Sequence, residues 1–309
     1  MSTLLDRRLI VVTGKGGVGK TTVAAALGLA AARSGRRTLV CEVASQERIT
    51  TTFGVAAAGF EEVEIEPRLH AFSVNPDEAI QEWLRYQLHS RTLAGLLGGS
   101  RIFQYLAAAA PGLAELVTVG KVWELAQLER KTPRSAPYDI VIVDAPATGH
   151  GLALLRAPQT FREVARVGPI NRQAGIIDAF VRDPSTTAVL AVTLAEEMPV
   201  SETLDLERRL QDELSMRLDR VLVNSVLPER LTAADRDTLK AVDGSGSSTA
   251  RAAIAASLAT HQTIRAQRTQ LARLRRGTDA RVATLPHLLT PDVGRDDLER
   301  LSRALEQKL

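Results

Sequence analysis

Short runs of aliphatic residues recur along the chain, and longer segments with the composition of helices separate them. Several runs, such as residues 140–143 (IVIV), do not alternate apolar with polar positions, which is typical of strands covered on both faces of a parallel sheet. The pattern predicts an α/β fold: a doubly wound, mostly parallel sheet of about seven or eight strands with helices on both faces. The predicted strands are residues 9–13, 38–43, 69–74, 138–143, 187–194, 220–226 and 281–285.

Two helical segments stand out from this alternation. Residues 19–33 are rich in Ala and Leu and end shortly before Gly35, so they predict the helix of a first βαβ unit. More than sixty residues of mainly helical pattern separate the third predicted strand from the fourth, which is too long for a plain crossover. We therefore expect a helical subdomain at 76–135, inserted into a single domain that spans 1–309.

Composition and charge narrow the class of protein. Hydrophobic residues make up 45% of the chain and charged residues 24%, as in ordinary globular proteins. The formal net charge of +3 is small and dispersed, which argues against a nucleic-acid or membrane-surface binder. A single cysteine, Cys41, excludes an internal disulfide. Since no apolar run approaches the roughly 20 residues that cross a bilayer or forms the core of an export signal, we expect a cytoplasmic protein without stable membrane insertion.

The first predicted strand runs into GKGGVGKT, residues 14–21, which matches the phosphate-binding motif G-x-x-x-x-G-K-[ST] and leads directly into the first helix. Glycines let successive backbone N–H groups surround phosphate oxygens, and the helix N-terminus adds its positive dipole end. Lys20 would reach the β and γ phosphates, and Thr21 would ligate Mg²⁺. A plain glycine turn, the alternative, does not explain this context. The expected site for ATP or ADP comprises Gly14, Lys15, Gly16, Gly17, Val18, Gly19, Lys20, Thr21 and Thr22.

A second lysine in this loop, Lys15, indicates a particular branch of such proteins. The sequence KGGVGKT resembles the deviant Walker A loop of dimeric P-loop ATPases, in which the earlier lysine crosses a nucleotide-bridged interface to touch the partner's phosphates. That charge would act like an arginine finger supplied in trans. A solvated loop lysine is the alternative, but the chain has only six lysines against 33 arginines, and two of the six lie in this loop.

The sequence from Asp144 onward extends the resemblance. Asp144 follows four aliphatic residues at the end of a predicted strand, the position of a Walker B aspartate near Mg²⁺. The stretch DAPATGHGLALLRAP, residues 144–158, resembles switch II of the ArsA family of P-loop ATPases, which includes the arsenite-pump ATPase and the ATPase that delivers tail-anchored membrane proteins. Supporting similarities, which extend the resemblance over nearly the whole chain, lie at residues 110–115, 183–203, 221–224 and 285–287.

The resemblance implies an ATPase that acts as a homodimer, or as a heterodimer with a second ArsA-like ATPase, on a protein client that the sequence does not name. Lys15 and Lys20 would be catalytic, and Thr21 and Asp144 would hold Mg²⁺. No nucleic-acid partner is expected.

The resemblance also implies how the base is bound. In relatives, an asparagine at the position of Asn224 hydrogen-bonds adenine, and the loop that matches Pro286 and His287 closes over the base. An amide offers both the donor and the acceptor that reading an adenine edge requires. An asparagine that caps a strand-to-loop turn is the alternative. None of the five histidines forms a pair at helical metal-ligand spacing, so we predict no zinc site.

The chain departs from the family pattern after the second predicted strand. Members usually carry D-P-A-H there, and the aspartate, which orients the attacking water, aligns with Ala44. Glu42 or Glu47 could substitute, and Glu42 is the catalytic candidate. The cysteines that bind arsenite or zinc in relatives are absent. Three methionines are too few for the Met-rich groove expected of a protein that holds transmembrane helices.

Two functions are compatible with these departures. The first is a nucleotide switch that hydrolyses ATP. The second is a nucleotide-binding regulatory or scaffold subunit with little intrinsic hydrolysis, which would complement a second ArsA-like subunit. A partition or septum-placement ATPase is a remote third choice, because the basic stretch 265–276 fits a solvated helix face better than a binding patch.

Overall fold

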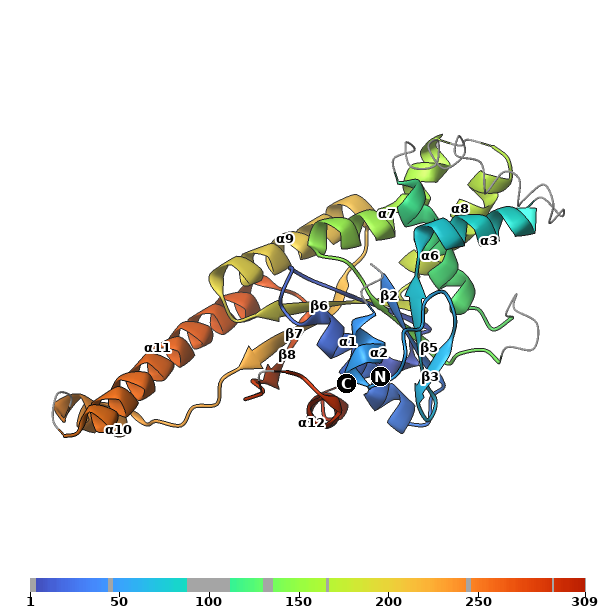
Figure 1. Ribbon diagram of the computed structural model, residues 1–309. Helices are drawn as coiled ribbons and strands as arrows, with labels where there is room; N and C mark the ends of the chain where they lie inside the picture. Colours follow the sequence, from blue (N-terminus) through green and yellow to red (C-terminus); the bar gives the residue numbers. More distant parts are fainter. Residues whose placement is uncertain are drawn as a thin grey trace.

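The computed structural model describes residues 4–43, 47–87, 112–129, 136–164, 167–242, 246–290 and 292–308. These residues form one eight-stranded sheet with the order β3-β4-β2-β5-β1-β6-β7-β8, surrounded by helices (Figure 1). Every neighbouring pair is parallel except β3 and β4, which confirms the predicted α/β fold. The strands are β1 (Leu9–Thr13), β2 (Thr38–Val43), β3 (Val63–Glu66), β4 (Leu69–Val74), β5 (Ile140–Asp144), β6 (Thr187–Leu194), β7 (Leu218–Val226) and β8 (Arg281–Pro286).

The helices cover both faces of this sheet (Figure 1). None of those described is both long and apolar enough to span a lipid bilayer. They are η1 (Leu4–Asp6, a 3₁₀ helix), α1 (Lys20–Arg33), α2 (Arg48–Thr52), α3 (Pro76–Gln87), α6 (Leu113–Leu125), α7 (Thr148–Val164), α8 (Pro169–Arg182), α9 (Glu197–Leu214), α10 (Ala233–Ala241), α11 (Ser248–Gly277) and α12 (Arg295–Glu306).

Two hydrophobic cores lie on opposite faces of the sheet. Along β1, Ile10 and Val12 pack with α1 and α12 on one face. Leu9 and Val11 point to the other face, where α6, α7, α8 and α9 pack. Because both faces are covered, every residue of β1 is buried, which explains why its sequence does not alternate. The sheet therefore holds the loop after β1 between two rigid layers.

The sequence pattern does not predict β3. This strand has only four residues, in which Val63 and Ile65 alternate with glutamates, and it pairs antiparallel with β4 at the edge of the sheet. Such a half-exposed edge strand lacks the aliphatic run that identifies the central strands. The strand predicted as third is consequently β4, and the inserted helical segment lies between β4 and β5.

The structure describes residues 76–87 and 112–129 of the predicted helical subdomain at 76–135. They contain α3 and α6, which pack against each other, and α6 also packs against α7 and α8. Figure 1 shows these four helices together at the upper right, whereas α10 and the 30-residue α11 extend to the lower left. The other residues of the predicted subdomain lie outside the described part of the chain, and its independence stays a prediction.

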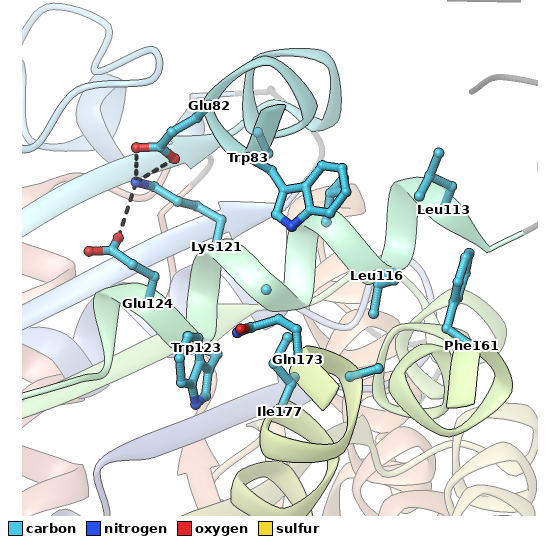
Figure 2. A pocket seen from close by; sticks show the side chains of 14 residues that line it. Glu82, Trp83, Leu113, Leu116, Lys121, Trp123, Glu124, Phe161, Gln173 and Ile177 are labelled. Atoms are coloured by element: carbon cyan, nitrogen blue, oxygen red, sulfur yellow. Dashed lines mark hydrogen bonds and ion pairs between the residues drawn. The ribbon is translucent and has the colours of Figure 1, made fainter. Parts of the chain in front are cut away.

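A narrow apolar pocket lies between these four helices, with Trp83 and Ile177 on its wall (Figure 2). At one end the buried Lys121 donates hydrogen bonds to Glu82 (3.0 Å) and Glu124 (3.1 Å). Burial by itself lowers the pKa of Lys121, but the two carboxylates outweigh it, and the pKa is raised. Because a buried charge is costly without a partner, this triad ties α3 firmly to α6.

Two helical glycines allow a matched test of how closely α1 approaches the sheet. A Cβ at Gly28 would lie 2.5 Å from Val40 Cγ2 and 3.0 Å from Leu69 Cδ1, whereas one at Gly120 would meet only Ile177 Cδ1 at 3.6 Å. We expect Gly28→Ala to lower the free energy of unfolding by about 1–3 kcal/mol through overpacking. Gly120→Ala should raise it by about 0.5–1 kcal/mol. Urea unfolding measures both, and equal effects would contradict the close packing of α1.

Candidate active site

The loop between β1 and α1 has a backbone that requires glycine at two places. Gly14 has a φ of 144°, and a Cβ there would lie 2.1 Å from the carbonyl oxygen of Val192 on β6. Gly19 has a φ of 89°, and a Cβ would lie 2.4 Å from Asn224 Nδ2. Since Gly19 has no side chain with which to cap α1, the first N–H groups of the helix remain available to an anion.

The loop opens into a cleft of about 520 Å³, which is within the size range of small-ligand sites. Polar groups from α1, α2 and the ends of β2 and β5 share its wall. Its lining includes Gly16, Gly17, Gly19, Lys20, Thr21, Thr22, Glu42, Arg48 and Asp144.

Lys20 lies in this cleft at the start of α1. Its Nζ donates a hydrogen bond to the carbonyl oxygen of Lys15, at 3.0 Å, so the ammonium group folds back over the loop. Burial lowers the pKa of Lys20, and the negative charge of Asp144 partly opposes that shift. The loop thus places a positive charge in the cleft, and this charge would attract the phosphate of a ligand.

Thr21 and Asp144 meet at the bottom of the cleft. The hydroxyl of Thr21 donates a hydrogen bond of 2.5 Å to Oδ2 of Asp144. Asp144 is 8% exposed, and its Oδ1 has no hydrogen-bond partner among the described residues. Burial raises the pKa of Asp144, while Thr21 and Lys20 lower it.

The hydroxyl oxygen of Thr21 and the carboxylate oxygens of Asp144 are suitable ligands for Mg²⁺. This ion prefers oxygen ligands and is usually held through one or two carboxylates together with substrate phosphates. No group of three or more His, Cys, Asp or Glu side chains in the described part of the chain could hold a metal by itself. Thr21 and Asp144 could therefore supply two of the ligands, and a nucleotide's phosphates would have to supply others.

Glu42 lies beside Asp144, because β2 and β5 pair these two residues directly. It is 6% exposed, and its carboxylate accepts hydrogen bonds from the backbone N–H groups of Arg48 (2.9 Å) and Ile49 (3.2 Å). Burial raises the pKa of Glu42, against the effect of these two bonds. Glu42 thus anchors the start of α2 as well as lining the cleft. Glu47 accepts a bond from the N–H of Gly59 (3.0 Å).

Ala44, which aligns with the water-orienting aspartate of the family, lies outside the described residues. The structure therefore does not test the predicted loss of that group, and Glu42 as its catalytic replacement stays a prediction. The position of the Glu42 carboxylate on the cleft wall is compatible with the prediction.

Lys15 has a partner that the sequence did not reveal. Its Nζ forms an ion pair with Oε1 of Glu202 on α9, at 2.5 Å, and Oε2 of Glu202 accepts a hydrogen bond of 3.4 Å from Thr148. Glu202 thereby links the glycine loop, the start of α7 and α9. Glu202 falls inside the segment 183–203 that resembles the family, but no feature of that segment points to Lys15.

Asn224 and the Pro286–His287 pair lie near one another. Asn224 Nδ2 donates to the carbonyl oxygen of Val18, at 3.0 Å. Pro286 pairs with Val226, and the N–H of His287 donates to the carbonyl oxygen of Val226, at 3.0 Å. Asn224, Pro286 and His287, the three residues predicted to bind the base, are not among the described residues that line the cleft. In this structure the Asn224 amide steadies the glycine loop, and its contact with a base stays a prediction.

Comparison with known proteins decides the family. A family model described as an anion-transporting ATPase, of ArsA type, matches residues 7–176 and 166–245. The chain belongs to this ArsA-type ATPase family. This confirms the resemblance found in the glycine loop and in residues 144–158.

Several curated proteins resemble this ArsA-type chain. It is 30% identical to ATPase BagA of Mycobacterium tuberculosis over 250 residues, which cover 79% of the chain and 72% of BagA. It is 28% identical to a putative arsenical pump-driving ATPase of Halobacterium salinarum, over 72% of the chain and 36% of that protein. It is 29% identical to ATPase GET3 of Chaetomium globosum, over 60% of the chain and 54% of that protein. The shared activity in these names is that of an ATPase.

Replacing Asp144 by Asn should stabilise the ligand-free protein at neutral pH. Burial raises the pKa of Asp144 above its unfolded value, so the cost of ionising it in the folded state is absent below the unfolded pKa and fully present above the folded pKa. Asn keeps an oxygen that accepts the Thr21 hydroxyl bond. We expect a gain of about 1 kcal/mol at about pH 8, and a smaller gain at about pH 5.

Urea unfolding of the ligand-free protein at the two pH values measures this gain. Asp205→Asn, at a side chain 52% exposed on α9, serves as the control and should change stability little. Equal or lower stability of Asp144→Asn at both pH values would show that burial does not oppose the charge of this carboxylate.

Proposed function

We propose that this ArsA-type chain is a cytoplasmic, Mg²⁺-dependent ATPase that works as a dimeric nucleotide switch. The observation that carries the proposal is the meeting of Lys20, Thr21 and Asp144 in one cleft at the mouth of the glycine loop. ATP and ADP would set its closed and open states.

Within the site, each group would have a distinct task. The N–H groups of the loop and the Lys20 ammonium would bind and orient the phosphates. Thr21 and Asp144 would hold Mg²⁺, which supplies charge neutralisation on the β and γ phosphates. Asn224, with Pro286 and His287 beside it, would contact adenine after exchanging its bond to the Val18 carbonyl for one to the base.

Lys15 would act across the dimer interface. To reach a partner's phosphates it must leave Glu202, and both side chains of that ion pair are about one third exposed (29% and 36%). Exposed pairs of this kind contribute only about 0–1 kcal/mol, so a second nucleotide-bound chain could compete for the lysine. The partner would be another copy of the chain or a second ArsA-like ATPase.

One observation favours the second candidate function, a nucleotide-binding regulatory or scaffold subunit with little hydrolysis of its own. The Glu42 carboxylate is already bonded to two backbone N–H groups, which leaves it fewer free lone pairs with which to orient water. Together with Ala44 in the sequence, this supports a slow site that complements a partner with an intact aspartate. Turnover by the isolated chain separates the two functions.

Lys20→Ala should weaken binding of Mg²⁺ and ATP by at least about tenfold, because a charged hydrogen bond to phosphate is lost. Titration calorimetry measures this, with Lys240→Ala on the exposed side of α10 as the control. Unchanged affinity in Lys20→Ala would overturn the phosphate site.

ATP should also bind better than GTP. Proteins that read guanine carry an N-K-x-D motif with an aspartate three residues after the asparagine, and the residues after Asn224 do not match it.

Lys15→Ala should lower ATP turnover by roughly 10³-fold in the active dimer, because it removes a charge from the transferring phosphoryl group. ATP binding to the mutated chain should stay nearly unchanged. Steady-state assays would use the isolated chain and its mixture with an ArsA-like chain that carries the aspartate at the position of Ala44. Turnover by the isolated wild-type chain at about 1 per second would show that it needs no second kind of subunit.

A further inference from the structure

The cleft contains a cation that neither the sequence motifs nor the proposed function uses. Arg48, the first residue of α2, lies on the cleft wall together with Lys20, Thr21 and Asp144. It is exposed and forms no ion pair with another described residue, although its charge acts on the Asp144 carboxyl group. A guanidinium group is permanently charged and presents a planar set of donors that matches phosphate oxygens.

The backbone around Arg48 is held on both sides. Its own N–H donates to the buried Glu42, as does that of Ile49. The preceding residue, Glu47, has a φ of 47°, a left-handed conformation that is uncommon outside glycine and is found at functional sites. The Glu47 side chain is fixed by the N–H of Gly59. These contacts direct the chain so that Arg48 begins α2 at the edge of the cleft.

The order of the strands indicates which phosphate Arg48 would meet. β7, which carries Asn224, lies on one side of β1, beyond β6, whereas β5 and then β2 lie on the other side. A nucleotide whose base contacts Asn224 would pass its phosphates over the loop after β1 and point the last one toward β5 and β2. Arg48 follows β2 in the chain and lines the same cleft as Asp144 at the end of β5.

We propose that Arg48 contacts the γ-phosphate of ATP in the site of its own chain, and that Glu42 is the residue that positions it. The inference rests on the proposed function, because the direction of the nucleotide comes from the proposed contact with Asn224. It gives the site a second cation in cis, beside Lys20 and independent of the one that Lys15 would supply in trans. Glu42 then acts through Arg48 and does not itself activate water.

Binding of ATP and ADP, each with Mg²⁺, to the full chain tests the proposal by calorimetry. Because only ATP has a γ-phosphate, Arg48→Ala should lower ATP affinity by about tenfold or more and change ADP affinity by less than about twofold. Arg48→Lys should restore part of the loss, since it keeps the charge without the planar donors. Arg303→Ala, at a side chain 71% exposed on α12, should bind both nucleotides as the wild type does.

The ratio of ATP affinity to ADP affinity also tests whether Glu42 positions Arg48. Glu42→Gln loses one of the two acceptors that hold α2, so it should reduce the preference for ATP in the same direction as Arg48→Ala. In the double variant its effect on that ratio should disappear, because both changes act through one contact. Lost turnover in Glu42→Gln with an unchanged ratio would overturn the positioning role.

The failures of the two proposals are distinguishable. If the wild-type chain bound neither ATP nor ADP, the proposed function would fail. If it bound both, and Arg48→Ala lowered both affinities equally or neither, the proposed γ-phosphate contact alone would be wrong. Thermal unfolding of each variant separates a lost contact from a lost fold, because a fold defect lowers the melting temperature and weakens both nucleotides together.

Discussion

The hydrogen bond from Thr21 to Asp144 depends on where two strands end. β1 and β5 are parallel neighbours, and Val12 pairs with Asp144, so the loop after β1 and the carboxylate at the end of β5 reach the same edge of the sheet. α1 therefore begins beside that carboxylate, and the Thr21 hydroxyl in its first turn donates a hydrogen bond of 2.5 Å to Asp144. The close approach of Gly28 to β2 and β4 fixes the direction of the helix. The cleft and the cations on its wall follow from this junction, and so does the place where the proposed function puts a metal.

The charges gathered there are unfavourable without a ligand. Burial raises the pKa of both Asp144 and Glu42 and lowers that of Lys20, so each of these groups is less stable in its charged form than it would be in water. Oδ1 of Asp144 lacks a partner among the described atoms. Under the proposed function, a metal and a triphosphate would satisfy these groups together. The site therefore exchanges stability of the empty protein for affinity toward a charged ligand.

The sequence allowed good prediction of features that depend on neighbouring residues. The glycine loop, α1 and the buried strands are encoded in continuous segments, so their patterns sufficed. β3 escaped prediction because four residues at a sheet edge carry too little apolar signal. The partnership of Lys15 with Glu202 also escaped, since 187 residues separate them and only the packing of α9 beside the loop brings them together. The same holds for Glu42, whose bonds to α2 depend on a left-handed turn at Glu47.

Glu202 makes a connection between the site and the helices around the inserted segment. It joins Lys15 in the glycine loop to Thr148 at the start of α7. α7 packs against α6 and α8, and the Lys121 triad joins α6 to α3. If Lys15 leaves Glu202 to reach a partner's phosphates, the Glu202 carboxylate loses its positive partner but still accepts the hydrogen bond from Thr148. The strength of that bond at the start of α7 would then change. Because packed helices shift as units and do not deform continuously, that change would give the proposed dimer a physical route to the inserted helices.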